Sequence, residues 1–357
     1  MTARRRTVVL GAVTGLIVLA ALALITGVGR EVTASSSEFI FGTYVKVTVT
    51  GRGAAAAAER AIQRMKEIDR LFDPGEAGSD IARLSAAAGL PGDVTVSSDT
   101  LALLAKANEA YRLSGGAFDP TVGPLVSLWG FGPQDPAVAG TPADTQRTEP
   151  PDAAAIQAAR ALVGWSGVRW DDARSTAALL RPGMALNSGG LGKGYAIDEA
   201  AAVLRGAGVK RAVIDAGGEL YLLGEKPGGQ VWRIGVRHPR QNGHLGVLEL
   251  GPDVAVATSG DYQRFFDYEG RRFHHLIDPA TGWPATGCRS VTVVARTSVE
   301  ADYLSTALFV LGPEEGLRLA ETLPGVQAVF VNAQGGLVVT SGLKDIFVPT
   351  EGGEGGG

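Results

Sequence analysis

The chain has 357 residues, 45% of them apolar, so it can bury the core of one large domain or two modest ones. Its formal net charge is −4, and the body of the chain contains no long block of Lys or Arg, which excludes the electrostatic footprint of a nucleic-acid-binding protein. Cys288 is the single cysteine, so an intramolecular disulfide, a cysteine-rich zinc site and an iron–sulfur cluster are excluded. We interpret Cys288 as a passive thiol at a strand edge.

Residues 1–35 predict an export signal or a membrane anchor. Three arginines, at positions 4 to 6, precede an uncharged apolar run from Val8 to Gly29. About 20 apolar residues suffice to cross a membrane, whereas the apolar part of a cleaved signal usually has about 7–15, so this run favours an uncleaved anchor. The arginines should stay in the cytoplasm, so we expect the body of the protein on the extracytoplasmic side of the cell membrane.

Residues 36–349 are expected to form the folded body of the protein. After a Ser-rich connector at residues 35–37, the segment 43–50 alternates polar and β-branched residues, which predicts a half-buried strand. The segment 54–72 carries apolar residues at helical spacing with charges on the opposite face, and the segment 97–116 repeats this pattern. The body therefore begins with a strand followed by helices.

Short apolar or alternating segments recur after residue 210 and predict strands. They are "RAVIDAGG", "VWRIGVR", "DVAVATSG", "SVTVVART", "QAVFVNA" and "GLVVTS". Helices are predicted at about 193–206, 299–310 and 314–322. This mixed order predicts an α+β fold, a single body of mixed, largely antiparallel sheets packed with helices. The Pro- and Gly-rich segment 132–151 is interpreted as a surface excursion, and residues 350–357 as a flexible Gly-rich tail.

The stretch "LNSGGLGKGYAID", residues 186–198, has the composition of a phosphate-binding loop. A Walker loop is excluded because Asn187 stands where the first glycine is required and Lys193 is followed by Gly194. A dinucleotide G-x-G-x-x-G fingerprint does not fit either. Glycines, a helix beginning near Lys193 and its positive charge could still bind an anion. The alternative is that the glycines only turn a strand into a helix.

The segment "FHHLIDPATGWP" offers two adjacent histidines ahead of Asp278. Adjacent residues of a strand point to opposite faces, so at most one of His274 and His275 can point into a given cleft. Histidine is the natural proton acceptor near neutral pH, although a surface or capping role is the alternative.

The segment "SVEADYLSTALFVLG" reads as a helix in which Asp302 and Thr306 are four residues apart and share a face. A carboxylate and a hydroxyl are hard oxygen ligands that suit Mg²⁺. The alternative is a threonine that bonds its own helix backbone beside a solvated aspartate. In "SGGAFDPTVGPLVSLWGFG", Phe118, Trp129 and Phe131 surround Asp119 and could form either the wall of a planar ligand site or a corner of the core.

Taken together and in this order, eight segments resemble the FAD:protein FMN transferase (ApbE-type) family. The matching segments are "FGTYVKV", "SDIARLS", "GAFDPTVGPLV", "GGLGKGYAID", "IDAGGELYLLG", "ATSGDYQRFF", "HLIDPATGWP" and "VEADYLSTALFVLG". They extend from about Phe41 to Gly312, over nearly all of the expected body. Each segment alone is a weak signal, but eight in register are highly specific.

The resemblance implies an extracytoplasmic enzyme that binds FAD and, with Mg²⁺, cleaves its pyrophosphate. It implies transfer of FMN to a threonine hydroxyl of a partner protein, typically a membrane-associated electron-transfer subunit, with release of AMP. The glycine-rich loop would then serve the FAD pyrophosphate and a metal ion rather than ATP. Such a transfer needs charge neutralisation and alignment more than covalent help from the protein.

The resemblance also assigns roles to individual residues of this chain. Asp302 and Thr306 match the side-chain metal ligands of the family, and the carbonyl of Gly190 matches its backbone ligand. His275 matches a histidine associated with activity; it would act as general base or polarise the attacking threonine, with Asp302 as the second member of the catalytic set. The positions expected to bind FAD are Phe41, Ala117, Phe118, Asp119, Asn187, Lys193 and Ile277.

The chain departs from the family at the head of the glycine-rich loop, where Asn187 replaces the usual aspartate. An asparagine can hydrogen-bond a flavin or a ribose, but it supplies no negative charge. Two alternatives therefore stand beside the transferase: a non-catalytic FAD-binding accessory protein in extracytoplasmic redox enzyme maturation, and an FAD pyrophosphatase that uses water as the acceptor.

Overall fold

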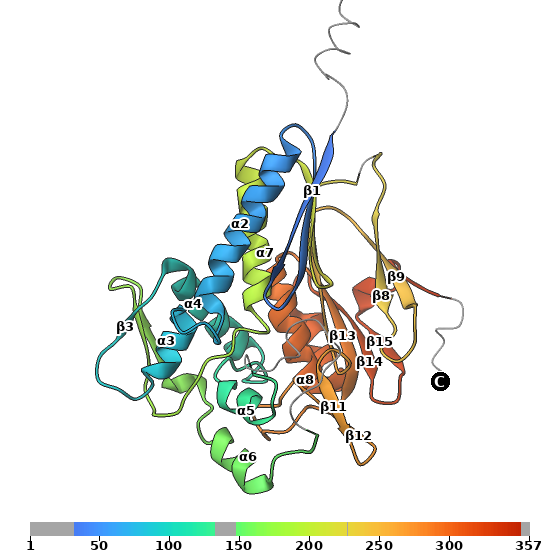
Figure 1. Cartoon of the computed structure of the whole chain (residues 1–357). Helices are drawn as coiled ribbons and strands as arrows, with labels where there is room; N and C mark the ends of the chain where they lie inside the picture. Colours follow the sequence, from blue (N-terminus) through green and yellow to red (C-terminus); the bar gives the residue numbers. More distant parts are fainter. Residues whose placement is uncertain (1–31, 133–147, 227, 351–357) are drawn as a thin grey trace, which may run out of the picture.

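The computed structural model describes residues 32–132, 148–226 and 228–350, and its centre is an eight-stranded antiparallel sheet (Figure 1). In spatial order its strands are β1 (Thr33–Ile40), β2 (Thr43–Thr50), β6 (Arg211–Ala216), β7 (Glu219–Leu223), β10 (Val254–Gly260), β13 (Cys288–Ala295), β14 (Gln327–Asn332) and β15 (Leu337–Val339). The predicted α+β class and its largely antiparallel pairing are confirmed.

Three long helices cover one face of this sheet. They are α2 (Ala54–Phe72), α7 (Gly192–Gly206) and α8 (Ser298–Thr322), and Figure 1 shows α2 and α7 running alongside each other. The apolar stripe that the sequence predicts in α2 is buried, because its alanines, isoleucines and Met65 pack into the main core. Burial of this stripe fixes the helical layer against the sheet.

A small sheet covers the opposite face, with the strand order β16 (Phe347–Pro349), β9 (His244–Leu250) and β8 (Trp232–Arg237). Its leucines and Val236 form a second apolar cluster with valines of the central sheet. The central sheet is therefore buried on both faces over much of its area, which explains why several of its strands are nearly continuous apolar runs.

The remaining elements form two smaller groups. One contains α3 (Asp80–Ala86), α4 (Ser98–Leu113) and the sheet β3 (Val94–Thr95), β5 (Thr176–Leu179) and β4 (Val168–Asp171), with a 3₁₀ turn at Trp165–Gly167 directly before β4. The other contains α5 (Gly123–Leu128), α6 (Ala153–Arg160) and the hairpin β11 (Phe265–Tyr268) and β12 (Arg271–His274), which share an aromatic cluster. Another 3₁₀ turn, at Ser341–Leu343, lies between β15 and β16.

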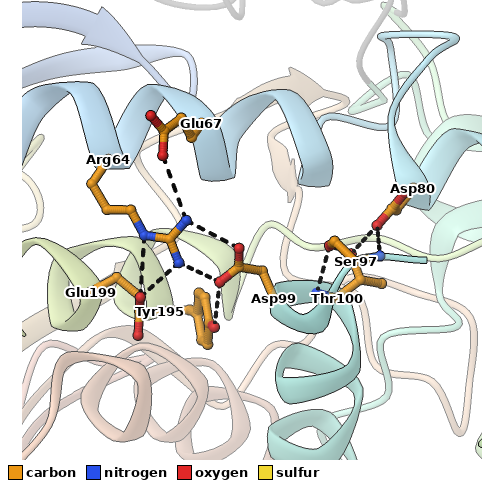
Figure 2. A network of polar contacts seen from close by, with 8 residues as sticks. All are labelled: Arg64, Glu67, Asp80, Ser97, Asp99, Thr100, Tyr195 and Glu199. Carbon is orange, nitrogen blue, oxygen red and sulfur yellow. Dashed lines mark hydrogen bonds and ion pairs between the residues drawn. The ribbon is translucent and has the colours of Figure 1, made fainter. Parts of the chain in front are cut away.

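A network of charges joins three helices around Arg64 of α2 (Figure 2). Its guanidinium donates to both carboxylate oxygens of Asp99 in the first turn of α4, at 3.1 and 2.5 Å. It also donates to Glu199 of α7 at 2.7 Å, and Tyr195 of α7 donates its hydroxyl to Asp99 at 2.8 Å. The network fixes α2, α4 and α7 relative to one another.

One expectation for the chain needs correction, and another is confirmed. Residues 35–37 are not a connector, because they lie inside β1, where backbone pairing with β2 and a 2.9 Å hydrogen bond between Ser35 and Thr48 outweigh the low strand propensity of serine. The two helices expected at 299–310 and 314–322 are confirmed as two helical segments of α8, separated by a kink at Gly312, whose φ of 78° and ψ of 177° are non-helical, ahead of Pro313.

Some predictions concern residues outside the described ranges. These are most of the N-terminal segment 1–35, most of the surface excursion at 132–151, and all but the first residue of the tail at 350–357. Among the described residues, no helix is both long and apolar enough to cross a membrane. Cys288 is buried at the start of β13, and burial raises the pKa of its thiol to about 12, as suits a passive cysteine.

Candidate functional site

A cleft opens where the loop before α7, the helix α8, the end of β10 and the segment after β12 meet. Its volume is about 720 Å³ when the part open to solvent is included, and clefts lined by apolar walls with a few polar groups are typical of small-molecule sites. Ten of the residues proposed from the sequence line it: Ala117, Phe118, Asp119, Asn187, Gly190, Lys193, His275, Ile277, Asp302 and Thr306. The fold therefore brings together residues that are far apart in the sequence.

The glycine-rich loop is held in place by hydrogen bonds on both sides. The backbone N–H of Asn187 donates to the carbonyl of Pro120 at 2.7 Å, and its side-chain Oδ1 accepts from the N–H of Gly189 at 2.9 Å. The hydroxyl of Ser188 donates to the carbonyl of Phe72, the last residue of α2, at 2.9 Å. Asn187 thus shapes the loop through an oxygen that an aspartate would also provide.

Gly190 lies against α8 at the position of Thr306. A Cβ atom at Gly190 would lie 2.9 Å from Thr306 Oγ1 and 3.1 Å from the ring of Phe118, so a glycine is required for this close approach. The hydroxyl of Thr306 lies 3.2 Å from that of Ser259 on β10, which in turn lies 2.9 Å from that of Ser305. A chain of hydroxyls therefore supports Thr306 from the side of the sheet.

A second close approach brings α7 against the start of α8. A Cβ atom at Gly194 would lie 2.4 Å from the carbonyl oxygen of Ser298, and the N–H of Gly194 donates to Asp302 Oδ2 at 3.0 Å. Asp198 of α7 accepts from the N–H groups of Ser298 and Val299 at 2.8 and 3.0 Å, so it stabilises the N-terminus of α8. These contacts fix where Asp302 points.

Asp302, Thr306 and Gly190 supply the oxygen donors expected for a metal ion. Both side chains line the cleft from one face of α8, as their spacing predicts, and the Gly190 backbone lies beside Thr306. Within the described ranges, no group of three or more His, Cys, Asp and Glu side chains could hold a metal. A carboxylate, a hydroxyl and a carbonyl fit Mg²⁺, which accepts a small set of oxygen ligands and keeps several waters.

Lys193 does not point freely into the cleft, because Glu219 binds it. Its ammonium lies 3.0 Å from Glu219 Oε1 and donates to the Gly189 carbonyl at 3.0 Å. Burial alone would lower the pKa of Lys193, but the charges of Asp302 and Glu219 outweigh burial and raise it above the usual value. Burial and the neighbouring charge of Asp302 raise the pKa of Glu219.

Glu219 is the main site residue that the sequence analysis missed. It is 8% exposed, and its second oxygen, Oε2, is buried without a hydrogen-bond partner among the described residues. A buried unpaired carboxylate oxygen is costly, so it is expected to meet a donor when the site is filled. The available signal was a single acid that follows two glycines at the start of an otherwise apolar strand.

The two adjacent histidines point to different surroundings, as predicted. His274 is buried, with Nε2 2.8 Å from the carbonyl of Ala285 and its ring packed edge-on against Phe309. Burial lowers the pKa of His274 to about 4. His274 is therefore a neutral structural residue.

His275 lines the cleft and has the orientation of a base. Its Nδ1 lies 3.3 Å from the carbonyl oxygen of Arg264, and because a carbonyl can only accept, Nδ1 carries the proton and Nε2 retains a free lone pair. Burial lowers the pKa of His275 well below its ordinary value, and the charge of Arg264 lowers it further. The imidazole is therefore neutral near pH 7.

The aromatic candidates divide between the cleft and the core. Phe118 lines the cleft, whereas Trp129 and Phe131 belong to the buried aromatic cluster beside it, where the indole N–H of Trp129 donates to the carbonyl of Gly282 at 2.9 Å. Phe41 is not among the residues that line the cleft. It lies in the β1–β2 turn with φ 53°, and its N–H donates to Asp69 at 3.2 Å.

Asp119 lines the cleft, but its carboxylate is already bound by the protein. One oxygen accepts from the N–H and the hydroxyl of Thr121 at 2.8 and 2.6 Å, and the other accepts from the N–H of Trp165 at 3.2 Å. Burial raises its pKa in spite of these bonds. In the structure, Asp119 fixes the loop that carries Phe118.

Comparisons with known proteins agree with this site. The model of the ApbE family matches residues 41–330. A protein of Treponema pallidum named FAD:protein FMN transferase is 32% identical over 87% of this chain and 88% of its own, and one of Klebsiella pneumoniae with the same name is 33% identical over 84% and 89%.

Solved structures show the same fold. The ApbE protein of Thermotoga maritima is 31% identical, with a TM-score of 0.79 over 88% of this chain and 99% of its own. The flavin transferase ApbE of Vibrio cholerae is 27% identical, with a TM-score of 0.76 over 89% of this chain and 100% of its own. The arrangement of the cleft, the family match and these similarities over nearly full lengths lead to one conclusion: the chain belongs to the ApbE family.

Proposed function

We propose that this protein is an FAD:protein FMN transferase that uses Mg²⁺ to transfer FMN from FAD to a threonine hydroxyl of a partner protein, with release of AMP. The observation that supports this most is a single cleft that holds the oxygen donors of Asp302, Thr306 and Gly190 together with a neutral His275. The transferase activity named for the relatives fits such a cleft.

In this reaction the threonine Oγ forms a bond to the phosphorus of the FMN half, and the bond from that phosphorus to the bridging oxygen breaks, so AMP leaves. Nε2 of His275 would accept the proton of the threonine hydroxyl, because Nδ1 is held by the Arg264 carbonyl. When bound, Mg²⁺ neutralises charge on the pyrophosphate. Asp302, Thr306 and the Gly190 carbonyl would hold it, while Phe118 and Ile277 would contact the ring systems of FAD.

Incubation with FAD, Mg²⁺ and an acceptor domain distinguishes the candidate functions. We expect a covalent FMN adduct on a threonine, detected by mass spectrometry, and one AMP per adduct. Free FMN and AMP without an adduct would indicate a pyrophosphatase. Tight FAD binding without AMP, unchanged by His275→Ala, would indicate an accessory protein. Asp302→Asn should abolish AMP release, and AMP release by this variant at the normal rate would refute the role of Asp302.

We also propose that the body acts outside the cytoplasm, anchored by the apolar run 8–29, and that the acceptor is itself membrane-associated. The three preceding arginines and the length of the run support this orientation. Cell fractionation and protease treatment of intact spheroplasts test the proposal. We expect the full-length protein in the membrane fraction, and we expect the protease to digest its body in intact spheroplasts. A body that is protected from the protease would contradict the proposal.

A further inference from the structure

The charges on one wall of the cleft suggest a role for the residue that sequence reasoning missed. Glu219 and Asp302 are buried, Lys193 is half-buried beside them, and the charge of Lys193 acts on both carboxylates. The contacts of Lys193 are unequal, because its ammonium lies 3.0 Å from Glu219 Oε1 and donates its other hydrogen bond to the Gly189 carbonyl. Asp302, by contrast, accepts a hydrogen bond at Oδ2 from the backbone N–H of Gly194.

A lysine so close to a metal ligand is a potential competitor of the metal. An ammonium group and a divalent cation both favour the carboxylate of Asp302, and like charges at short range repel each other strongly in a buried site. A second carboxylate that binds the lysine from the other side removes this competition. Glu219 occupies that position at the start of β7, directly after the turn at Gly217 and Gly218.

We infer that Glu219 is a positioning residue of the metal site, which binds Lys193 and so keeps its ammonium away from Asp302 when a divalent cation enters. This inference rests on the proposed function, since it assumes a metal ion at Asp302. Oε2 of Glu219 has no hydrogen-bond partner among the described residues, so it remains available to a donor that enters with the cation. Glu219 therefore acts on the metal through the lysine and through its own charge.

The distinctive consequence is that the effects of Glu219 and Lys193 are not additive. Without Glu219, the lysine becomes an unpaired cation that turns to Asp302, so Glu219→Gln should weaken metal binding strongly. Without Lys193, nothing competes for Asp302, so the same substitution should matter much less. Lys193→Met alone removes a positive charge and should leave metal binding as tight as in the wild type, or tighter.

A double-mutant cycle of Glu219→Gln and Lys193→Met in the whole protein tests this non-additivity. Mn²⁺ alone is the probe, without FAD, and the free Mn²⁺ is measured by electron paramagnetic resonance. We expect Glu219→Gln to raise the Kd of Mn²⁺ more than about tenfold, and its effect to be at least about tenfold smaller in the Lys193→Met background, a coupling of about 1.4 kcal/mol. Urea unfolding of each variant checks that it is folded.

Three outcomes separate the possibilities. Equal effects of Glu219→Gln in both backgrounds would overturn the inference but leave the metal site intact. Weaker Mn²⁺ binding by Lys193→Met than by the wild type would also overturn it, and this result does not depend on whether Glu219→Gln folds. If the wild type and the control Asp302→Asn bind Mn²⁺ equally poorly, the metal site of the proposed function fails, and the inference fails with it.

Discussion

Gly194 is the point at which a single methyl group should disturb both the fold and the site. In Gly194→Ala, the new Cβ would lie 2.4 Å from the Ser298 carbonyl oxygen and 2.7 Å from Val299 Cα. Ordinary contact begins near 3.4 Å, so α7 and α8 must move apart by about 1 Å. Overpacking of this kind costs about 1–3 kcal/mol, and the higher helix propensity of alanine returns up to about 1 kcal/mol.

A net loss of about 1–2 kcal/mol in the free energy of unfolding follows for Gly194→Ala, measured by urea unfolding with tryptophan fluorescence. Gly206→Ala is the matched control, because Gly206 ends the same helix and its added Cβ would meet nothing within 4 Å. It should be neutral or slightly stabilising. Since the N–H of Gly194 also holds Asp302, Gly194→Ala should weaken Mn²⁺ binding while Gly206→Ala does not. Equal stability and equal Mn²⁺ affinity of the two variants would refute the close-approach argument.

Four further predictions concern charge and protonation. Asn187→Asp should keep the hydrogen bond from the N–H of Gly189, because the side-chain Oδ1 is its acceptor. The variant adds a negative charge to the cleft, so Mn²⁺ should bind several-fold more tightly. Unchanged or weaker Mn²⁺ binding would contradict this expectation. Because the pKa of His275 is lowered well below its ordinary value, its neutral, basic form persists on acidification. The rate of FMN transfer should therefore stay level down to pH 6.5 and fall only at lower pH. A fall in rate centred at or above pH 6.5 would argue against His275 as the base. His274 has a pKa of about 4 in the folded protein, against an ordinary value of 6.5. Its burial as a neutral group therefore stabilises the fold fully above pH 6.5, and the free energy of unfolding should decline by about 3 kcal/mol as the pH falls to 4. His274→Gln should reduce this pH dependence, measured by urea unfolding at each pH. Arg64→Met should lower the free energy of unfolding by about 1–3 kcal/mol, because it leaves partly buried carboxylates unpaired. FAD binding by this variant, measured by flavin fluorescence, should stay normal. A variant as stable as the wild type would show that the Arg64 network in Figure 2 contributes little to stability.

Local periodicity explains why part of the site could be predicted from the sequence. Helical spacing alone puts Asp302 and Thr306 on one face, and strand alternation alone separates His274 from His275. The order of the eight strands could not be predicted in this way, because it depends on pairing between segments far apart in the chain. Glu219 was missed for the same reason, since its importance comes from Lys193, which is distant in sequence.

The resemblance supplied residues that local patterns do not reveal, and the structure distinguishes among them. Ala117 and Ile277 carry no chemical signal of their own, yet both line the cleft. Asp119 also lines it, but hydrogen bonds to its own loop engage both of its oxygens. Whether a carboxylate binds a ligand or its own backbone depends on loop geometry, which the residue type does not determine.

The geometry at the start of α7 answers the question that its glycine-rich loop raises. A helix N-terminus followed by a lysine usually favours an anion. Here the protein supplies the negative groups, because Asp302 accepts from the N–H of Gly194 and Glu219 binds Lys193. Lys193, Glu219 and Asp302 together carry a formal charge of −1, which attracts a cation, while Arg264 lines the same cleft as a positive group. A pyrophosphate is therefore better accommodated together with a divalent ion than by the loop alone, and the glycines serve mainly to bring the loop and α7 against α8.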